Sequence, residues 1–317
     1  MFKYIIKRLL ISIPVFLGIT LCVFIMSSLA PGSPADRLAA ETGLTQLEYD
    51  ALEKSLGLDK PILVRYVIWL KDFVRGDLGN SYDTGKSVSK TIGNRLGPTL
   101  LLTGTSLLIA ILVAVPLGVL MSRKPYGKLD YFGSGFSFLG QAVPTFFSSL
   151  ILIYLFAVKL KILPISGMID ANGKVTFIGT VKHLVMPVFV LSWLLTANLL
   201  RYTRASMLEV FNEEYVKTAR SKGITESRVM IKHVLRNGLI PIVTAIGLQV
   251  PFLFGGACVV EKIFTWPGIG SLLVNSITTR DYPVIMGITC MIAIVVLVTN
   301  LVLDIIYAAL DPRIAFD

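Results

Sequence analysis

Long apolar runs alternate with short polar segments along almost the whole chain. A helix needs about 20 consecutive apolar residues to cross the hydrocarbon core of a bilayer. Six runs are long enough, and they are predicted at residues 9–30, 99–121, 133–158, 181–200, 239–260 and 284–310. The pattern therefore predicts an all-α integral membrane protein with six transmembrane helices.

Composition and charge agree with a membrane protein. The chain of 317 residues is 54% hydrophobic and only 16% charged, whereas soluble domains contain about 25% charged residues. Lys and Arg are densest in the segments that lie inside if the N-terminus is inside, and such a bias favours the cytoplasmic side. We therefore predict that both termini are cytoplasmic. The net charge of +10 reflects this asymmetry and does not indicate nucleic-acid binding.

The spacing of the runs predicts four segments along the chain. Residues 1–30 are the N-terminal tail and first span, and residues 31–98 form an extracytoplasmic helical loop subdomain. Residues 99–310 form a core transmembrane domain of five spans with a cytoplasmic coupling loop at 201–238, and residues 311–317 are a cytoplasmic tail. The start also resembles a signal peptide. The apolar core of a signal peptide is shorter, about 7–15 residues, so we expect a retained anchor.

The outer loop contains start and stop signals for two helices. Thr45 and Glu48 form a capping box, and Gly57 ends the helix that follows. Pro61 begins a second helix, in which apolar residues recur at helical spacing: Ile62, Tyr66, Trp69 and Phe73. Such a stripe predicts packing against a neighbouring element rather than a ligand platform.

A strongly basic loop lies between two apolar runs at residues 201–241. Its eight basic residues are Arg201, Arg204, Lys217, Arg220, Lys222, Arg228, Lys232 and Arg236. Asn212 can cap a short helix of about 10 residues, and Gly223 can end that helix in the left-handed conformation. A second helix is predicted to start at Thr225 and to run toward the next span. The loop is therefore expected to hold a short helix crosswise between two spans.

Motifs in this loop and at both ends of the chain resemble one protein family. The loop motifs are Glu214-Tyr215-Val216, Thr218-Ala219-Arg220, Lys222-Gly223, His233, Leu235-Arg236-Asn237 and Pro241. Further motifs are Ala30-Pro31-Gly32, Gly76-Asp77-Leu78-Gly79, Trp266-Pro267-Gly268-Ile269-Gly270 and Leu310-Asp311-Pro312-Arg313. Together they resemble permease subunits of ATP-binding-cassette importers, of the first-permease type in the peptide/nickel (oligopeptide and dipeptide) subgroup. The chain has Lys217 and Thr218 where the general importer signature has Glu and Ala.

The resemblance implies a permease subunit that is not itself an enzyme. It implies half of a translocation pathway for peptides in the cytoplasmic (inner or plasma) membrane of a prokaryote, in contact with membrane lipid. The implied partners are a second homologous permease, two ATPase subunits and an extracytoplasmic substrate-binding protein. ATP and Mg would be used by the ATPase subunits, so no cofactor and no nucleic acid is expected on this chain.

The short helix of the basic loop is the expected contact for the ATPase subunits. Its free face is predicted to consist of Tyr215, Lys217, Thr218 and Arg220, with Ala219 allowing a close approach. The complete set of candidate coupling residues is Glu214, Tyr215, Lys217, Thr218, Ala219, Arg220 and Gly223. We expect force from ATP hydrolysis to enter the membrane through this helix.

Polar and helix-breaking residues within the predicted spans mark candidate pathway positions. Pro144 is expected to kink the third span, and the fifth span is the most interrupted by Pro and Gly. Polar side chains at membrane depth favour a wall that faces other helices or a pathway, and the candidates are Gln141, Thr145, Asn198 and Gln249. Asp304 is expected to reach the inner interface and pair with a base such as Arg201, with a transport role as the alternative. An Asn-Gly pair at 172–173 predicts an outer hairpin.

Other function classes lack support in the sequence. The three cysteines all fall in predicted spans, and His183 and His233 are far apart, so no metal site is predicted. Residues 80–87 look like a phosphate-binding loop, but they begin with Asn80 instead of Gly and lack the strand and helix that such a loop needs. A stand-alone secondary transporter remains the alternative function, and nickel or another small solute the alternative substrate. Co-purification of ATPase subunits distinguishes an importer permease from a stand-alone carrier.

Overall fold

Helices make up the regular structure of the computed structural model, which describes residues 2–169, 173, 176–255 and 257–310. Within these residues, β pairing is limited to an isolated bridge between Asn80 and Ser87. The predicted all-α fold is confirmed. The hairpin prediction depends on residues 170–172 and 174–175, and the predicted tail on 311–317, which lie outside the described residues.

Among the described residues, five helical segments are long and apolar enough to cross a membrane. They are carried by α1 (Phe2–Leu29), α5 (Val88–Arg123), α8 (Phe177–Phe211), the segment Pro241–Ile263 and α15 (Tyr282–Leu310). A sixth candidate consists of two helical pieces bent by 97° relative to one another. The described part of the chain therefore accounts for the six predicted runs when the bent pair counts as one span.

The bend in the sixth candidate lies at Pro144. It separates α6 (Lys128–Ala142) from α7 (Thr145–Leu152), which continues as the π-helical segment η1 (Ile153–Lys159). Proline has no N–H for the preceding turn and disfavours helical geometry in the residue before it. Val143 accordingly adopts φ −82° and ψ 118°, outside the helical region. The predicted kink of the third span is confirmed as a sharp break.

The fifth span is broken into three short helices. These are α11 (Arg236–Gly247), α12 (Val250–Gly255) and α13 (Cys258–Ile263). A Cβ atom on Gly247 would overlap the side chain of Leu303. This glycine therefore permits close packing where α11 ends, and the predicted interruption of the span is confirmed.

The chain divides into two compact units, and each is described by itself. The first comprises Met1–Pro98 and Gly268–Val298, and the second comprises Thr99–Pro267 and Thr299–Asp317. The long helices α5 and α15 contribute residues to both units.

In the first unit, the outer-loop helices begin and end where the sequence predicts. α3 (Gln46–Ser55) begins at the capping box, in which the backbone N–H of Thr45 donates to Glu48 Oε2 at 2.8 Å. Gly57 follows this helix with φ +66°. These signals are local, so the sequence alone was enough to find them.

The aromatic stripe of α4 (Ile62–Val74) packs against its neighbours, as predicted. The rings of Tyr66 and Trp69 stack with centroids 5.8 Å apart, and the Tyr66 hydroxyl lies 3.0 Å from Thr20 Oγ1 of α1. The rings of Phe24 and Tyr66 meet edge to face at 5.6 Å. Aromatic contacts thus join α4 to α1.

Two helices of the first unit were not expected from the sequence, α2 (Pro34–Thr42) and α14 (Ile269–Thr279). The turn after α14 contains Asp281, which is only 3% exposed. Its carboxylate accepts hydrogen bonds from Ser81 Oγ at 2.5 Å and from the backbone N–H of Tyr82 at 3.0 Å. This buried carboxylate fastens the end of the outer loop to the start of α15.

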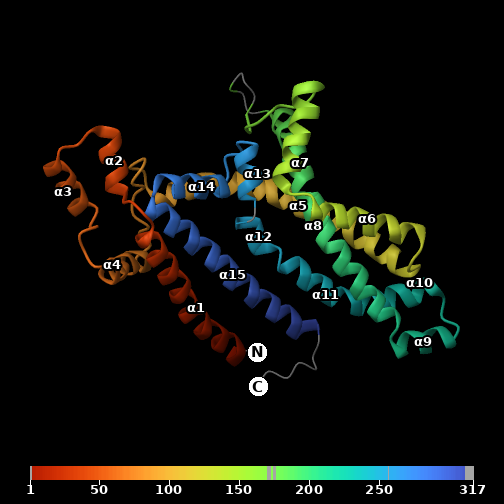
Figure 1. The fold of residues 1–317 in the computed structure, drawn as a ribbon. Helices are drawn as coiled ribbons and strands as arrows, with labels where there is room; N and C mark the ends of the chain where they lie inside the picture. The colour runs from red at the N-terminus through yellow and green to blue at the C-terminus, as the bar shows by residue number, and fades with distance from the viewer. Residues whose placement is uncertain (1, 170–172, 174–175, 256, 311–317) are drawn as a thin grey trace. The chain divides into compact units, whose positions relative to one another are not determined.

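In the second unit, α8 is the central element, and α6, α7, α11 and α13 pack on it (Figure 1). α6 approaches α8 closely because Gly140 has no side chain: a Cβ there would lie 2.8 Å from Ala197 Cβ. Glu261 of α13 is fully buried and accepts a hydrogen bond from Thr99 Oγ1 at 3.0 Å. The predicted fifth span ends at residue 260, just before Glu261, so burial of this carboxylate was not predicted.

Candidate functional site

The basic loop begins later than the sequence predicts, because α8 continues through Phe211. Asn212 was expected to cap the short helix, and that prediction is wrong. It lies at the C-terminal end of α8, and its side-chain amide donates to the backbone oxygen of Leu208 at 3.0 Å. Val210 and Phe211 pack against the core of the second unit, and this packing extends α8 beyond the predicted span.

The short helix is α9 (Glu214–Ser221), which has 8 residues instead of about 10. Gly223 follows it with φ +73°, so the predicted left-handed end is confirmed. The backbone N–H of Gly223 donates to Arg220 O at 2.9 Å, and that of Ile224 donates to Ala219 O at 3.4 Å. These bonds satisfy carbonyl groups that the end of a helix leaves open.

After this turn the chain re-enters the second unit as one nearly continuous helical path. Thr225 lies at the predicted cap position of α10 (Glu226–Val229), which leads through the π-helical segment η2 (Met230–Leu235) into α11. Ile224 and Val229 belong to the same apolar cluster, as the predicted staple requires. α9 is therefore held between the end of α8 and the start of α11.

The apolar side of α9 is buried within this chain. Val216 is 0% and Ala219 5% exposed, and both join a cluster that contains Met207 of α8 and Val234 of η2. Ala219 was predicted to lie at the free face and to allow a close approach there, and that prediction is wrong. Val216 and Ala219 are three residues apart and so lie on one side of the helix, and this side is used for packing.

Two polar contacts fix α9 from its other sides. The guanidinium of Arg220 donates to both carboxylate oxygens of Glu226, at 2.7 Å and 3.2 Å, and lies 5.6 Å from the ring centre of Phe211. The hydrogen bonds from Arg220 lower the pKa of Glu226 below its usual range. The side-chain amide of Asn237 donates to the Tyr215 hydroxyl at 2.9 Å. Both ends of α9 are thus tied to the helical path that follows it, through Glu226 of α10 and Asn237 of α11.

The remaining candidate residues form an exposed face. Glu214, Tyr215, Lys217, Thr218 and Arg220 are all exposed. Lys217 Nζ lies 2.7 Å from Glu214 Oε1, and Thr218 Oγ1 donates to Glu214 O at 2.9 Å. The structure therefore brings these five predicted coupling residues together on one accessible surface.

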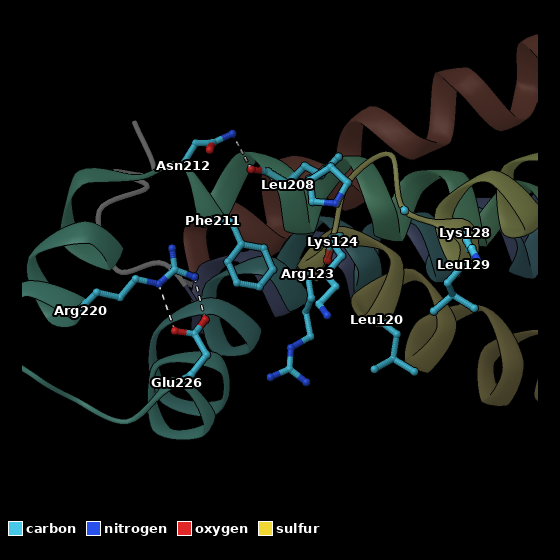
Figure 2. Close-up of a pocket in the computed structure, with 13 residues that line it drawn as sticks. Leu120, Arg123, Lys124, Lys128, Leu129, Leu208, Phe211, Asn212, Arg220 and Glu226 are labelled. Atoms are coloured by element: carbon cyan, nitrogen blue, oxygen red, sulfur yellow. Dashed lines mark hydrogen bonds and ion pairs between the residues drawn. The ribbon is translucent and has the colours of Figure 1, made fainter.

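A pocket of about 740 Å³ lies beside α9, between the ends of α5 and α8. Arg123, Lys124 and Lys128 contribute basic side chains to it (Figure 2). Figure 2 shows the Phe211 ring between the Arg220–Glu226 pair and Arg123. Among the α9 residues, Arg220 lines this basic pocket, so the pocket borders the exposed face of α9 at that residue.

An ion pair supports the wall of this pocket. Arg204 of α8 donates from Nε and Nη2 to the two carboxylate oxygens of Asp130 at 2.5 Å and 2.7 Å. Asp130 also accepts from the backbone N–H of Tyr126 at 2.8 Å. Because Asp130 is 3% exposed, this contact fixes the turn between α5 and α6 to α8.

The four pathway candidates do not form one cluster of hydrogen-bonded side chains in the described part of the chain. Gln141 is exposed at the end of α6 and donates to Ala197 O at 3.4 Å, next to Asn198 of α8. Thr145 begins α7 after the break, and Gln249 lies between α11 and α12. Two of the four therefore mark helix breaks, and their role in a pathway stays a prediction.

Sequence reasoning missed the residues that hold the site together. Glu226, Asn237, Asp130 and Phe211 were not predicted to contact anything. Asn237 was noted as part of a motif, and Glu226 follows Arg220 by six residues, but neither spacing identifies a contact across a turn. These contacts depend on how α9 folds back on the helices before and after it.

Comparisons with known proteins agree on one family. The family described as "Binding-protein-dependent transport system inner membrane component" matches residues 114–316, and the family of the N-terminal part of such membrane components matches residues 1–103. The chain is 44% identical to the oligopeptide transport system permease protein AppB of Bacillus subtilis over 100% of both chains. It is 36% identical to the dipeptide transport system permease protein DppB of Escherichia coli over 99% of each.

Solved structures show the same fold at low sequence identity. An amino acid ABC transporter chain aligns with a TM-score of 0.54 and 17% identity, over 70% of this chain and 94% of that chain. A methionine ABC transporter, MetNI, in an inward-facing conformation aligns with a TM-score of 0.54 and 16% identity, over 70% and 97%.

Proposed function

This chain belongs to the family of inner membrane components of binding-protein-dependent transport systems, and on that premise we propose that it is the permease of a peptide importer. It forms half of a translocation pathway in the bacterial inner membrane. The proposal of peptides as substrate is supported by full-length relatives whose names give oligopeptide and dipeptide transport.

Other subunits supply the energy and the substrate. A second, homologous permease completes the pathway, two ATPase subunits bind ATP and Mg, and a binding protein on the outer side delivers the peptide. This chain hydrolyses nothing itself and needs no cofactor. A contact with the ATPase subunits must therefore carry the coupling.

The observation that carries this proposal is the exposed face of α9 on a firmly anchored helix. An isolated helix of 8 residues is unstable in water, since helices below about 12–15 residues are marginal. Here Val216 and Ala219 bury one side and two polar contacts hold the others. The exposed face, with Lys217 and Thr218, is left for a partner.

The anchoring gives α9 a mechanical role. A displacement of α9 passes to α8 through Phe211 and to α11 through Glu226 and Asn237. Both helices belong to segments that are long and apolar enough to span the membrane. Movement of the ATPase subunits would in this way reach the spans without a chemical step in this chain.

A bulky side chain on the exposed face tests the proposal. We expect Thr218→Trp to block docking sterically. The purified importer should then lose its ATPase subunits, or its transport-coupled ATP hydrolysis should fall at least about tenfold. The readouts are subunit stoichiometry and ATP hydrolysis of the complex in nanodiscs.

The matched control is Thr42→Trp at the end of α2. Thr42 is also exposed on a short helix, and its hydroxyl also donates to the carbonyl four residues before it, at 2.6 Å. We expect this variant to keep both ATPase subunits. If Thr218→Trp matches Thr42→Trp in stoichiometry and hydrolysis, α9 is not the coupling contact.

A further inference from the structure

A second pocket, of about 340 Å³, lies within the first unit, away from the coupling loop in sequence. It is formed by α4, the end of α3 and the residues after it, the end of the outer loop, the start of α15 and Phe24 of α1. Its volume falls in the range of small-molecule sites, about 300–1,000 Å³. Nothing in the coupling mechanism uses it.

Five charged residues line this pocket, Lys54, Lys60, Arg65, Asp72 and Asp77, and Arg65 is the one that also lies over an aromatic ring. The residue is half-buried, and its guanidinium carbon lies 5.7 Å from the ring centre of Phe24. In the part of the chain that the structure describes, no carboxylate lies within ion-pair distance of it. A partly desolvated arginine without a carboxylate partner favours an anion, and a planar carboxylate suits its paired donors best.

Aromatic rings form the walls around Arg65. Trp69, Tyr82 and Tyr282 line the same pocket, and the rings of Tyr82 and Tyr282 meet edge to face at 6.5 Å. Burial raises the pKa of Tyr82, and the nearby positive charge of Arg65 opposes that rise. These rings could pack against an apolar side chain of a ligand.

This wall is preorganised by the buried carboxylate of Asp281. It holds the backbone N–H of Tyr82 at 3.0 Å and the hydroxyl of Ser81 at 2.5 Å. The tyrosine is therefore positioned before any ligand arrives, which lowers the entropic cost of binding.

A negative charge lies on the same face of α4. Arg65, Trp69 and Asp72 are spaced at i, i+4 and i+7, so they follow one side of the helix, and all three line the pocket. Seven residues of helix rise by about 10 Å, a distance that about three extended residues span. The positive charge of Arg65 and the negative charge of Asp72 are thus spaced to match the terminal carboxylate and the terminal ammonium of a short peptide.

We propose that this pocket binds a free peptide of about three residues, with Arg65 receiving the terminal carboxylate, Asp72 the terminal ammonium and the aromatic rings an apolar side chain between them. The inference rests on the proposed function in peptide import and adds a site on the permease itself. With the predicted topology, this site faces the outer side, where peptide arrives. A lipid phosphate would use Arg65 but not Asp72, so we favour the peptide.

The test measures binding to the assembled importer in nanodiscs without its binding protein. The probe is radiolabelled alanyl-alanyl-phenylalanine, and its carboxyl-terminal amide is the matched ligand. We expect amidation to weaken binding at least about tenfold, the effect of losing a charge-assisted hydrogen bond. This comparison uses the unmodified protein and is independent of any folding defect.

Variants then locate the binding to Arg65. We expect Arg65→Gln to weaken binding of the free peptide at least about tenfold and to abolish the preference over the amide. Arg65→Lys keeps the charge but loses the paired donors, so we expect an intermediate affinity. Arg75→Gln is the control, because Arg75 is an exposed arginine at the end of α4 and does not line the pocket.

The outcomes separate this inference from the proposed function. Equal binding of acid and amide, or an unchanged preference in Arg65→Gln, overturns the inference. So does displacement of the probe by short-chain phosphatidylglycerol but not by unlabelled peptide. ATP-dependent uptake of the same peptide by proteoliposomes with the binding protein tests import separately. Uptake without acid-selective binding leaves import standing and removes the site, and the reverse result supports the site and contradicts import.

Discussion

At the scale of single residues, the contact between Arg220 and Glu226 decides how firmly α9 is held. Their side chains are 42% and 49% exposed, so solvent screens the pair, and such pairs contribute roughly 0–1 kcal/mol. The bidentate geometry and the Phe211 ring place this contact toward the upper part of that range. The contact between Arg220 and Glu226 therefore fixes the position of α9 more than it stabilises the fold.

The lowered pKa of Glu226 predicts when this contact acts. A carboxylate whose folded pKa is depressed stabilises above its unfolded pKa, about 4.3 for Glu. The contribution is lost as pH falls through the lower folded pKa. We expect Glu226→Gln to reduce hydrogen-exchange protection of residues 214–229 by an amount that stays constant from pH 8 to about 5 and disappears at lower pH.

The control for this prediction is Glu214→Gln. Glu214 pairs with Lys217, but its side chain is 86% exposed, so we expect no measurable change. Equal effects of the two substitutions would show that the Arg220–Glu226 contact has no special part in holding α9.

At the scale of elements, the sequence predicted that α9 exists and where it ends, but not where it begins or which side of it is buried. The basic loop, the left-handed Gly223 and the start of a helix after Thr225 are local signals, and all appear in the structure, although the Thr225 side chain makes no capping hydrogen bond. The side on which Ala219 lies depends on what α8 and η2 bring against it. Motif resemblance marked Ala219 for partner contact, whereas packing within the chain uses it. The spacing of Val216 and Ala219 was the available clue.

A substitution at Ala219 therefore has a different expected effect from one at Thr218. Trp at position 219 would overfill a packed cluster, which typically costs about 1–3 kcal/mol. We expect Ala219→Trp to raise hydrogen exchange in both α9 and residues 226–234, while Thr218→Trp leaves exchange there unchanged. Both variants should impair coupling, so exchange is the measurement that separates them. Unchanged exchange in Ala219→Trp would return Ala219 to the exposed face.

At the scale of the whole molecule, periodicity and charge predicted the helical membrane fold, but not how spans break. The sequence indicated a kink at Pro144, yet not a bend of 97°. α14 was missed because its 11 residues are too few for a span and carry no cap signal that was recognised. The buried Glu261 was missed because its partner Thr99 lies 162 residues earlier. Such contacts have no signature in a single sequence.

The predicted topology can be tested by chemical labelling. In a background without the three native cysteines, we introduce Leu47→Cys on α3 or Tyr126→Cys between α5 and α6. These positions are 80% and 78% exposed, respectively. Position 47 should react with an impermeant thiol reagent in intact cells, and position 126 only after permeabilisation. The opposite pattern would invert the assigned orientation.

The break at Pro144 also has a consequence for how the protein enters the bilayer during synthesis. α6 has 15 residues, which rise by about 22 Å, less than the roughly 30 Å of hydrocarbon. α7 and η1, which form the second half, have 8 and 7 residues, so this half is no longer than the first. Neither half is long enough for the insertion machinery to transfer it alone into the bilayer. The two halves must therefore enter the bilayer together. α8, which packs on both halves, emerges next from the ribosome and is the element that can stabilise them.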